Sequence, residues 1–187
     1  IMILTKTRAG LLNLYKMVSE SHINTFAGVH RLKKSYLHRM REGLLYGATG
    51  GDNDFYQAFI EGRCQELIDR TAEFYDYFEL YPIPVARTYV GADMIAEDQA
   101  LGALQVELYR FVKSLGKKVI ASANVKILNP EDEILRRILL VGKKTVRNAD
   151  VPDYCYFRTT GEMLRDFAYF GQAEAREMVI TAPREIV

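Results

Sequence analysis

Short apolar segments alternate with helical patterns along this chain, and this alternation most constrains its fold. The apolar segments are 1–5, 44–46, 77–81 and 119–121. Each is bounded by turn residues or by proline, as Pro82 and Pro84 bound the third. Strands that alternate with helices are typical of an α/β sheet or barrel, in which right-handed helical crossovers join parallel strands. We therefore predict that 44–46, 77–81 and 118–121 are neighbouring parallel strands.

Apolar residues recur at helical spacing between these strands. Residues 9–22 place Leu11, Leu14, Tyr15 and Val18 on one stripe. Residues 98–115 show the clearest helical period, and Gly116 stands where a C-terminal cap belongs. The remaining predicted helices are 54–61, 64–75, and two short ones near 161–169 and 172–181.

Two helix starts carry capping signals. Asn129 precedes Pro130, which favours Asn129 as the N-cap of a helix. We expect this helix to turn its apolar residues toward the core; they are Ile134, Leu135, Ile138 and Leu139. Thr159 and Glu162 have the spacing of a capping box, in which each side chain bonds the other's backbone N–H. Residues 142–153 are polar and are predicted to form a loop.

Composition narrows the class of protein. The 187 residues suffice for one domain with a sizeable core. A net charge of +1 argues against a free-standing nucleic-acid binder, so any basic patch must be local. The chain has no apolar run of about 20 residues, the length of a membrane span, and Cys64 and Cys155 form no Cys-x-x-Cys motif. We expect a cytoplasmic protein with two reduced thiols.

Four strands are too few for a closed barrel, and an open sheet leaves its edges unpaired. We therefore expect the chain to be part of a larger α/β unit. Isolated, it would cover its exposed edges and apolar faces by self-association or with segments beyond the printed sequence.

Five motifs, in order, resemble one protein family. They are GLLNLYKMVS (10–19), REGLLYG (41–47), FYDYFEL (74–80), LNPED (128–132) and YFRTTGEML (156–164). Together they resemble the PHP (polymerase and histidinol phosphatase) domain of C-type bacterial DNA polymerases III, in the part that follows an inserted exonuclease. The resemblance implies that residues 1–187 are a single domain, the C-terminal half of a distorted seven-stranded, TIM-like β/α barrel. It also implies a parent DNA-directed DNA polymerase, a nucleotidyltransferase, whose exonuclease and palm are the partners of this chain.

The resemblance further implies which residues would bind metal. Active PHP domains cleave phosphoesters with clustered divalent ions, and the family pattern supplies a Cys, an Asp and a His in this half. Those positions hold Gly50, Asn124 and Lys126. Glycine offers no ligand, asparagine a neutral oxygen, and lysine a repelling charge. We therefore expect no metal, no other cofactor and no catalytic residue in this chain.

Other titratable residues are candidate metal ligands. Asp52 and Asp54 lie close in sequence to the lost cysteine position, yet they also precede a predicted helix, where carboxylates complement the helix dipole. The capping interpretation is favoured. His22, His30 and His38 have no metal-ligand spacing and no nucleophile partner, so they are interpreted as surface or half-buried residues.

A basic stretch at 30–41 is the remaining candidate contact surface. Its cations are Arg31, Lys33, Lys34, Arg39 and Arg41. Tyr36 stands among them, a combination that also occurs where proteins bind DNA. A solvated face, or a surface that docks on another polymerase domain, is favoured because the whole chain is nearly neutral.

Three functions therefore stand open. The preferred one is a structural segment of a replicative polymerase. The second is a metal-dependent phosphoesterase half-domain that acts only with its missing N-terminal half, and the loss of three ligands speaks against it. The third is a module that binds primer–template DNA, which salt-dependent DNA affinity would favour.

Overall fold

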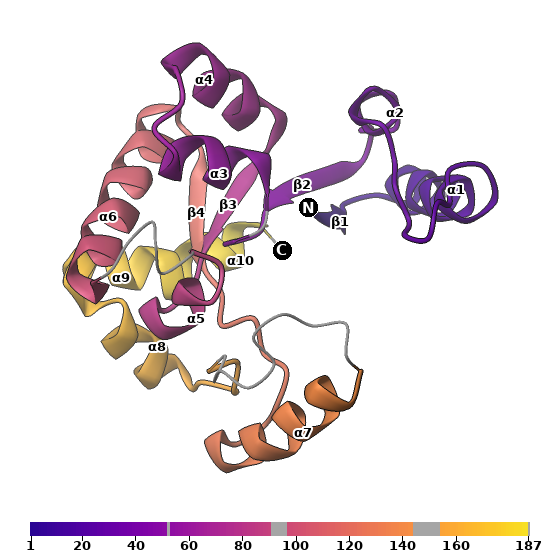
Figure 1. Ribbon diagram of the computed structural model, residues 1–187. Helices are drawn as coiled ribbons and strands as arrows, with labels where there is room; N and C mark the ends of the chain where they lie inside the picture. Colours follow the sequence, from indigo (N-terminus) through magenta and orange to yellow (C-terminus); the bar gives the residue numbers. More distant parts are fainter. Residues whose placement is uncertain (52, 91–96, 144–153, 187) are drawn as a thin grey trace.

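A four-stranded sheet organises the part of the chain that the structure describes (Figure 1). The computed structural model describes residues 1–51, 53–90, 97–143 and 154–186. The strands are β1 (Met2–Thr5), β2 (Leu44–Ala48), β3 (Tyr77–Leu80) and β4 (Lys118–Ala121), in that spatial order. β2, β3 and β4 are parallel, which confirms the predicted neighbours, whereas β1 runs antiparallel to β2. Within the described residues the sheet is open, and no closed barrel forms.

Helical crossovers join the parallel strands and cover one face of the sheet. α3 (Asp54–Ile60) and α4 (Gln65–Phe74) connect β2 to β3, and α5 (Ile83–Arg87) and α6 (Asp98–Ser114) connect β3 to β4. Alternate strand residues point into this layer, because successive side chains leave a strand on opposite faces. The buried core accordingly joins sheet and helix residues; among them are Tyr46, Phe78, Val119, Phe55 and Val112.

An arm carries the first two helices to one side of the sheet (Figure 1). It consists of β1, α1 (Arg8–Ile23) and α2 (Lys34–Arg39), the last of which the sequence did not predict. The predicted stripe of α1 does not face the core: Leu14 is half-buried, whereas Leu11, Tyr15 and Val18 are 39–60% exposed. α1 instead buries the row that contains Gly10, Met17 and Ser21.

The C-terminal third packs a series of short helices beside α6 and β4. These elements are α8 (Thr160–Asp166), η2 (Ala168–Phe170), α9 (Gln172–Arg176), the π-helical turn η3 (Glu177–Thr181) and α10 (Ala182–Ile186). The predicted capping box of Thr159 and Glu162 opens α8, so this prediction is confirmed. The second predicted helix is also present, and α10 extends it to residue 186.

The helix after β4 stands away from the sheet (Figure 1). Asn129 is the N-cap of η1 (Pro130–Asp132), as predicted, and α7 (Glu133–Lys143) follows. The prediction that its apolar residues face the core is wrong. Ile134, Leu135, Ile138 and Leu139 are 60–69% exposed, because no described element packs over them. Residues 144–153 of the predicted loop lie outside the described residues.

Candidate functional sites at the sheet edge and the basic arm

The carboxyl ends of the parallel strands bring three loops to one edge of the sheet, the usual place for ligands in α/β folds. Gly50 follows β2, Tyr81 follows β3 and Asn124 follows β4. A Cβ atom on Gly50 would lie 2.9 Å from the Glu79 carbonyl oxygen and 2.9 Å from the Tyr81 ring. The position that the resemblance assigned to a metal-binding cysteine therefore has no room for a side chain.

Tyrosine side chains occupy this edge. The Tyr89 ring lies where a side chain on Gly51 would stand, with its Cγ 2.4 Å from that Cβ position. The centroids of the Tyr81 and Tyr89 rings are 5.6 Å apart. The Tyr89 hydroxyl accepts a hydrogen bond of 2.6 Å from Asn124 Nδ2, and Asn124 holds a left-handed backbone at φ 48°. The Asn124 amide thus binds a phenol.

Lys126 holds the third position that the resemblance assigned to a metal ligand. No described side-chain contact links it to Tyr81, Tyr89 or Asn124. The residue is exposed, and its backbone N–H donates to the Cys155 carbonyl oxygen at 2.7 Å. Across the described ranges, no group of three His, Cys, Asp or Glu residues is placed to hold a metal ion.

Sequence reasoning missed a buried carboxyl close to this edge. Glu79 of β3 is only 6% exposed, and burial raises its pKa, while hydrogen bonds with Ser122 and Tyr77 act in the opposite direction. The sequence does contain an indication of this burial, because Glu79 lies between Tyr77 and Tyr81 on the same face of the strand. Among the described residues Glu79 belongs to no group of three potential metal ligands, so this carboxyl does not by itself make a metal site.

The first prediction concerns metal content. The purified chain, dialysed against metal-free buffer, is expected to hold far less than one equivalent of zinc or manganese, since a multi-ion site needs most of its ligands. Elemental analysis measures this directly. Near-stoichiometric metal, or electron density for an ion in contact with Asn124, would contradict it.

Two of the five predicted contact cations are engaged within the chain. Lys34 forms an ion pair with Asp54, which sits in the first turn of α3. Arg41 binds Asp76 at 2.6 Å and the Phe74 carbonyl oxygen at 2.7 Å. These two side chains fasten the arm to the body, and are less available to a partner.

The capping interpretation of the acidic loop can be checked in part. Asn53 is the N-cap of α3, and its side chain accepts from the Tyr56 backbone N–H at 3.0 Å. Asp54 follows in the first turn, where its carboxylate complements the helix dipole. Asp52 lies outside the described residues.

The other three cations are presented to the outside. Arg31, Lys33 and Arg39 are exposed, and the Arg39 guanidinium lies 5.3 Å from the centroid of the Tyr36 ring. All three histidines are exposed, as predicted. The rings of His22 and His30 are 3.9 Å apart, a contact that their separation in sequence did not indicate.

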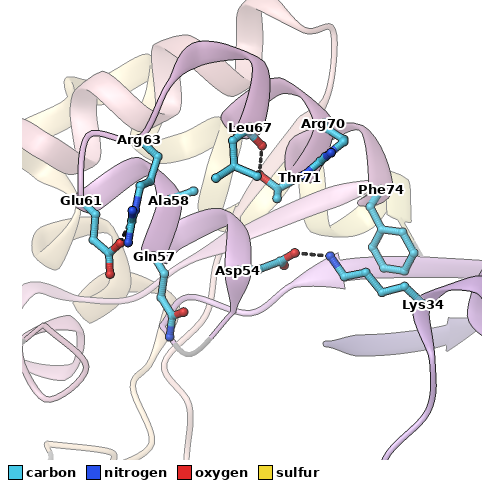
Figure 2. Close-up of a pocket in the computed structure, with 10 residues that line it drawn as sticks. All are labelled: Lys34, Asp54, Gln57, Ala58, Glu61, Arg63, Leu67, Arg70, Thr71 and Phe74. Atoms are coloured by element: carbon cyan, nitrogen blue, oxygen red, sulfur yellow. Dashed lines mark hydrogen bonds and ion pairs between the residues drawn. The ribbon is translucent and has the colours of Figure 1, made fainter.

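A hollow of about 580 Å³ opens between α2, α3 and α4 (Figure 2). Its lining mixes both charges; it consists of Lys34, Asp54, Gln57, Ala58, Glu61, Arg63, Leu67, Arg70, Thr71 and Phe74. Carboxylates already pair with Lys34 and with Arg63, the latter at 2.7 Å from Glu61. Because these pairs largely offset the charge of the walls, the hollow shows no clear selectivity for an anion or a cation.

Comparison with known proteins gives a consistent result along the whole chain. No family model matches. Proteins described as DNA polymerase III PolC-type are similar to it: that of Clostridium perfringens is 36% identical over 186 residues, and that of Listeria monocytogenes 34% over 188. The Bacillus subtilis protein is 34% identical over 187 residues. These alignments cover 98–100% of this chain and 13% of each relative. The chain is homologous to one segment of PolC-type polymerases.

Proposed function

We propose that this chain is a structural segment of a PolC-type replicative polymerase, the C-terminal half of a degenerate PHP domain. Homology along the whole chain supports the assignment to that polymerase. The observation that carries the structural role is the tyrosine-filled sheet edge, where Gly50 leaves no room for a ligand and Asn124 binds Tyr89. Nucleotidyl transfer belongs to other parts of the parent polypeptide.

In this role the chain supports the polymerase by packing its exposed apolar surfaces against other domains. The apolar face of α7, which consists of Ile134, Leu135, Ile138 and Leu139, is exposed in this chain. Apolar patches of this kind are usually buried against a partner, because removing them from water is favourable. The relatives have 87% of their length outside the aligned segment, as their 13% coverage implies. We assign the covering surface to those domains.

The second prediction tests this role. In the parent polymerase, the double variant Ile138→Ser with Leu139→Ser is expected to lower the midpoint of thermal unfolding by several degrees, because two buried apolar side chains are lost. In the isolated chain the same variant is expected to change the free energy of unfolding by no more than about 0.5 kcal/mol, since both residues are exposed there. Calorimetry of the two proteins gives the comparison.

Two outcomes would contradict the proposal. An unchanged unfolding midpoint in the parent polymerase would mean that no domain covers α7. A dimer of the isolated chain in light scattering that the double variant abolishes would mean that a second copy covers this face instead.

A further inference from the structure

The positive charge of this chain is concentrated at one end. Residues 1–43 contain eight Lys and Arg against two Asp and Glu, a formal excess of +6 in a chain whose total is +1. All three histidines lie in the same segment. These residues form the arm, with α1 and α2, that stands to one side of the sheet (Figure 1). Such a local excess is the electrostatic footprint of a surface that binds a polyanion.

A groove of about 350 Å³ lies between α1 and α2 on this arm. One wall of the groove is formed by α1 and its C-cap, which contribute two neighbouring rows of side chains spaced four residues apart. The other wall is the Tyr36 ring of α2. The lining residues are Tyr15, Lys16, Ser19, Glu20, Ile23, Asn24 and Tyr36. The Glu20 carboxylate accepts a hydrogen bond of 2.7 Å from Asn24 Nδ2 and remains the acidic group of this lining, opposite in charge to Lys16.

The aromatic residues of the groove are placed to stack. Tyr15 is 60% exposed, although burial of a tyrosine ring is favourable. Tyr36 carries the Arg39 guanidinium 5.3 Å from its ring centroid, so a cation stands directly beside an aromatic surface. Single-stranded nucleic acids bind to this combination, because bases stack on the rings while cations neutralise the adjoining phosphates.

We propose that the α1–α2 groove binds single-stranded DNA, with bases stacked on Tyr15 and Tyr36 and phosphates held by Lys16, Lys33 and Arg39. A duplex is a poorer ligand, since its paired bases are stacked on one another and cannot reach the rings. The strand binds to the groove and to the exposed cations beside it, whereas Lys34 and Arg41 remain in their ion pairs with Asp54 and Asp76.

Fluorescence anisotropy tests the proposal with a labelled 20-nucleotide single strand of mixed sequence, and with its duplex, titrated with the 187-residue chain from 50 to 200 mM salt. The single strand is expected to bind more tightly. Tyr15→Ala and Tyr36→Ala should each weaken its binding roughly 5-fold or more, the loss that one base–aromatic stack causes. Arg39→Gln should lower the slope of log affinity against log salt by about 0.7, the value for one lost phosphate contact on a single strand.

Matched variants outside the arm give the control. Phe157 is 55% exposed and Arg110 is exposed on α6, so Phe157→Ala and Arg110→Gln should leave the affinity unchanged. Circular dichroism of each variant confirms that it is folded. The proposal is overturned if the single strand does not bind at 50 mM salt, or if the tyrosine variants bind it as well as the original chain does. It is also overturned if the duplex or heparin binds as tightly as the single strand, since the surface would then be purely electrostatic.

Discussion

Replacing Arg158 by methionine is expected to lower the free energy of unfolding by about 3 kcal/mol, because the hydrogen bonds that a buried guanidinium donates to three acceptors are lost together. The Arg158 side chain is 2% exposed, and its Nε lies 2.7 Å from Asp166 Oδ2. One terminal nitrogen donates to the carbonyl oxygens of Tyr154 and Tyr156, at 2.9 and 3.2 Å. The guanidinium also lies 4.0 Å from the Tyr156 ring centroid.

Urea denaturation followed by circular dichroism measures the effect. Arg165 is exposed on the same helix, α8, so Arg165→Met is the matched control, with an expected change within about 0.5 kcal/mol. Arg158→Lys should also be destabilised, since lysine keeps the charge but cannot reach three acceptors with a planar fork. Equal stability of the Arg158 and Arg165 methionine variants would show that the network contributes nothing.

The parallel part of the sheet and the caps could be predicted because local patterns determine them. Short apolar runs specify β2, β3 and β4, and side chains three residues apart specify the capping box at Thr159. α2 and α5 were missed because six and five residues are too few to show a helical period. The antiparallel direction of β1 follows from its pairing with β2, which no local pattern in residues 1–5 records.

The apolar faces of α6 and α7 show a second limit of prediction from sequence, which concerns burial. Periodicity indicates that α7 has an apolar side, but it does not tell what covers that side. In the core helix α6 the same signal was correct, since Leu101, Leu108 and Val112 are at most 2% exposed. In α7 Leu139 is 69% exposed, because within the described residues no neighbouring element reaches it.

The candidate sites were predictable to different degrees. The loss of ligands at Gly50 and Asn124 could be inferred from the resemblance, but the tyrosines that fill the edge could not, since Tyr89 is 35 residues from Asn124. The basic stretch was visible, whereas the use of Lys34 and Arg41 depends on carboxylates 20 and 35 residues away. Such pairings are set by tertiary packing.

The arm that carries the groove is held by a close approach between two backbones. A Cβ atom on Gly10 of α1 would lie 1.9 Å from the Gly43 carbonyl oxygen, which also accepts from the Lys6 backbone N–H at 2.8 Å. Gly43 itself has a left-handed φ of 70°, and a Cβ there would lie 2.1 Å from the Thr7 hydroxyl. Neither glycine can therefore gain a side chain without separating α1 from the turn before β2.

Gly10→Ala is accordingly expected to lower the free energy of unfolding by about 3 kcal/mol, the upper part of the usual cost of overpacking, because the obstructing atoms belong to the backbone and cannot rotate away. Gly142→Ala is the matched control: a Cβ there meets nothing within 4 Å, and α7 should gain up to about 1 kcal/mol from the better helix former. Urea denaturation of both variants gives the comparison. If Gly10→Ala were as stable as Gly142→Ala, the arm would not depend on this contact. If Gly10→Ala unfolds more readily and also binds the single strand more weakly than its folded fraction accounts for, then the same contact positions α1 and α2 for the groove.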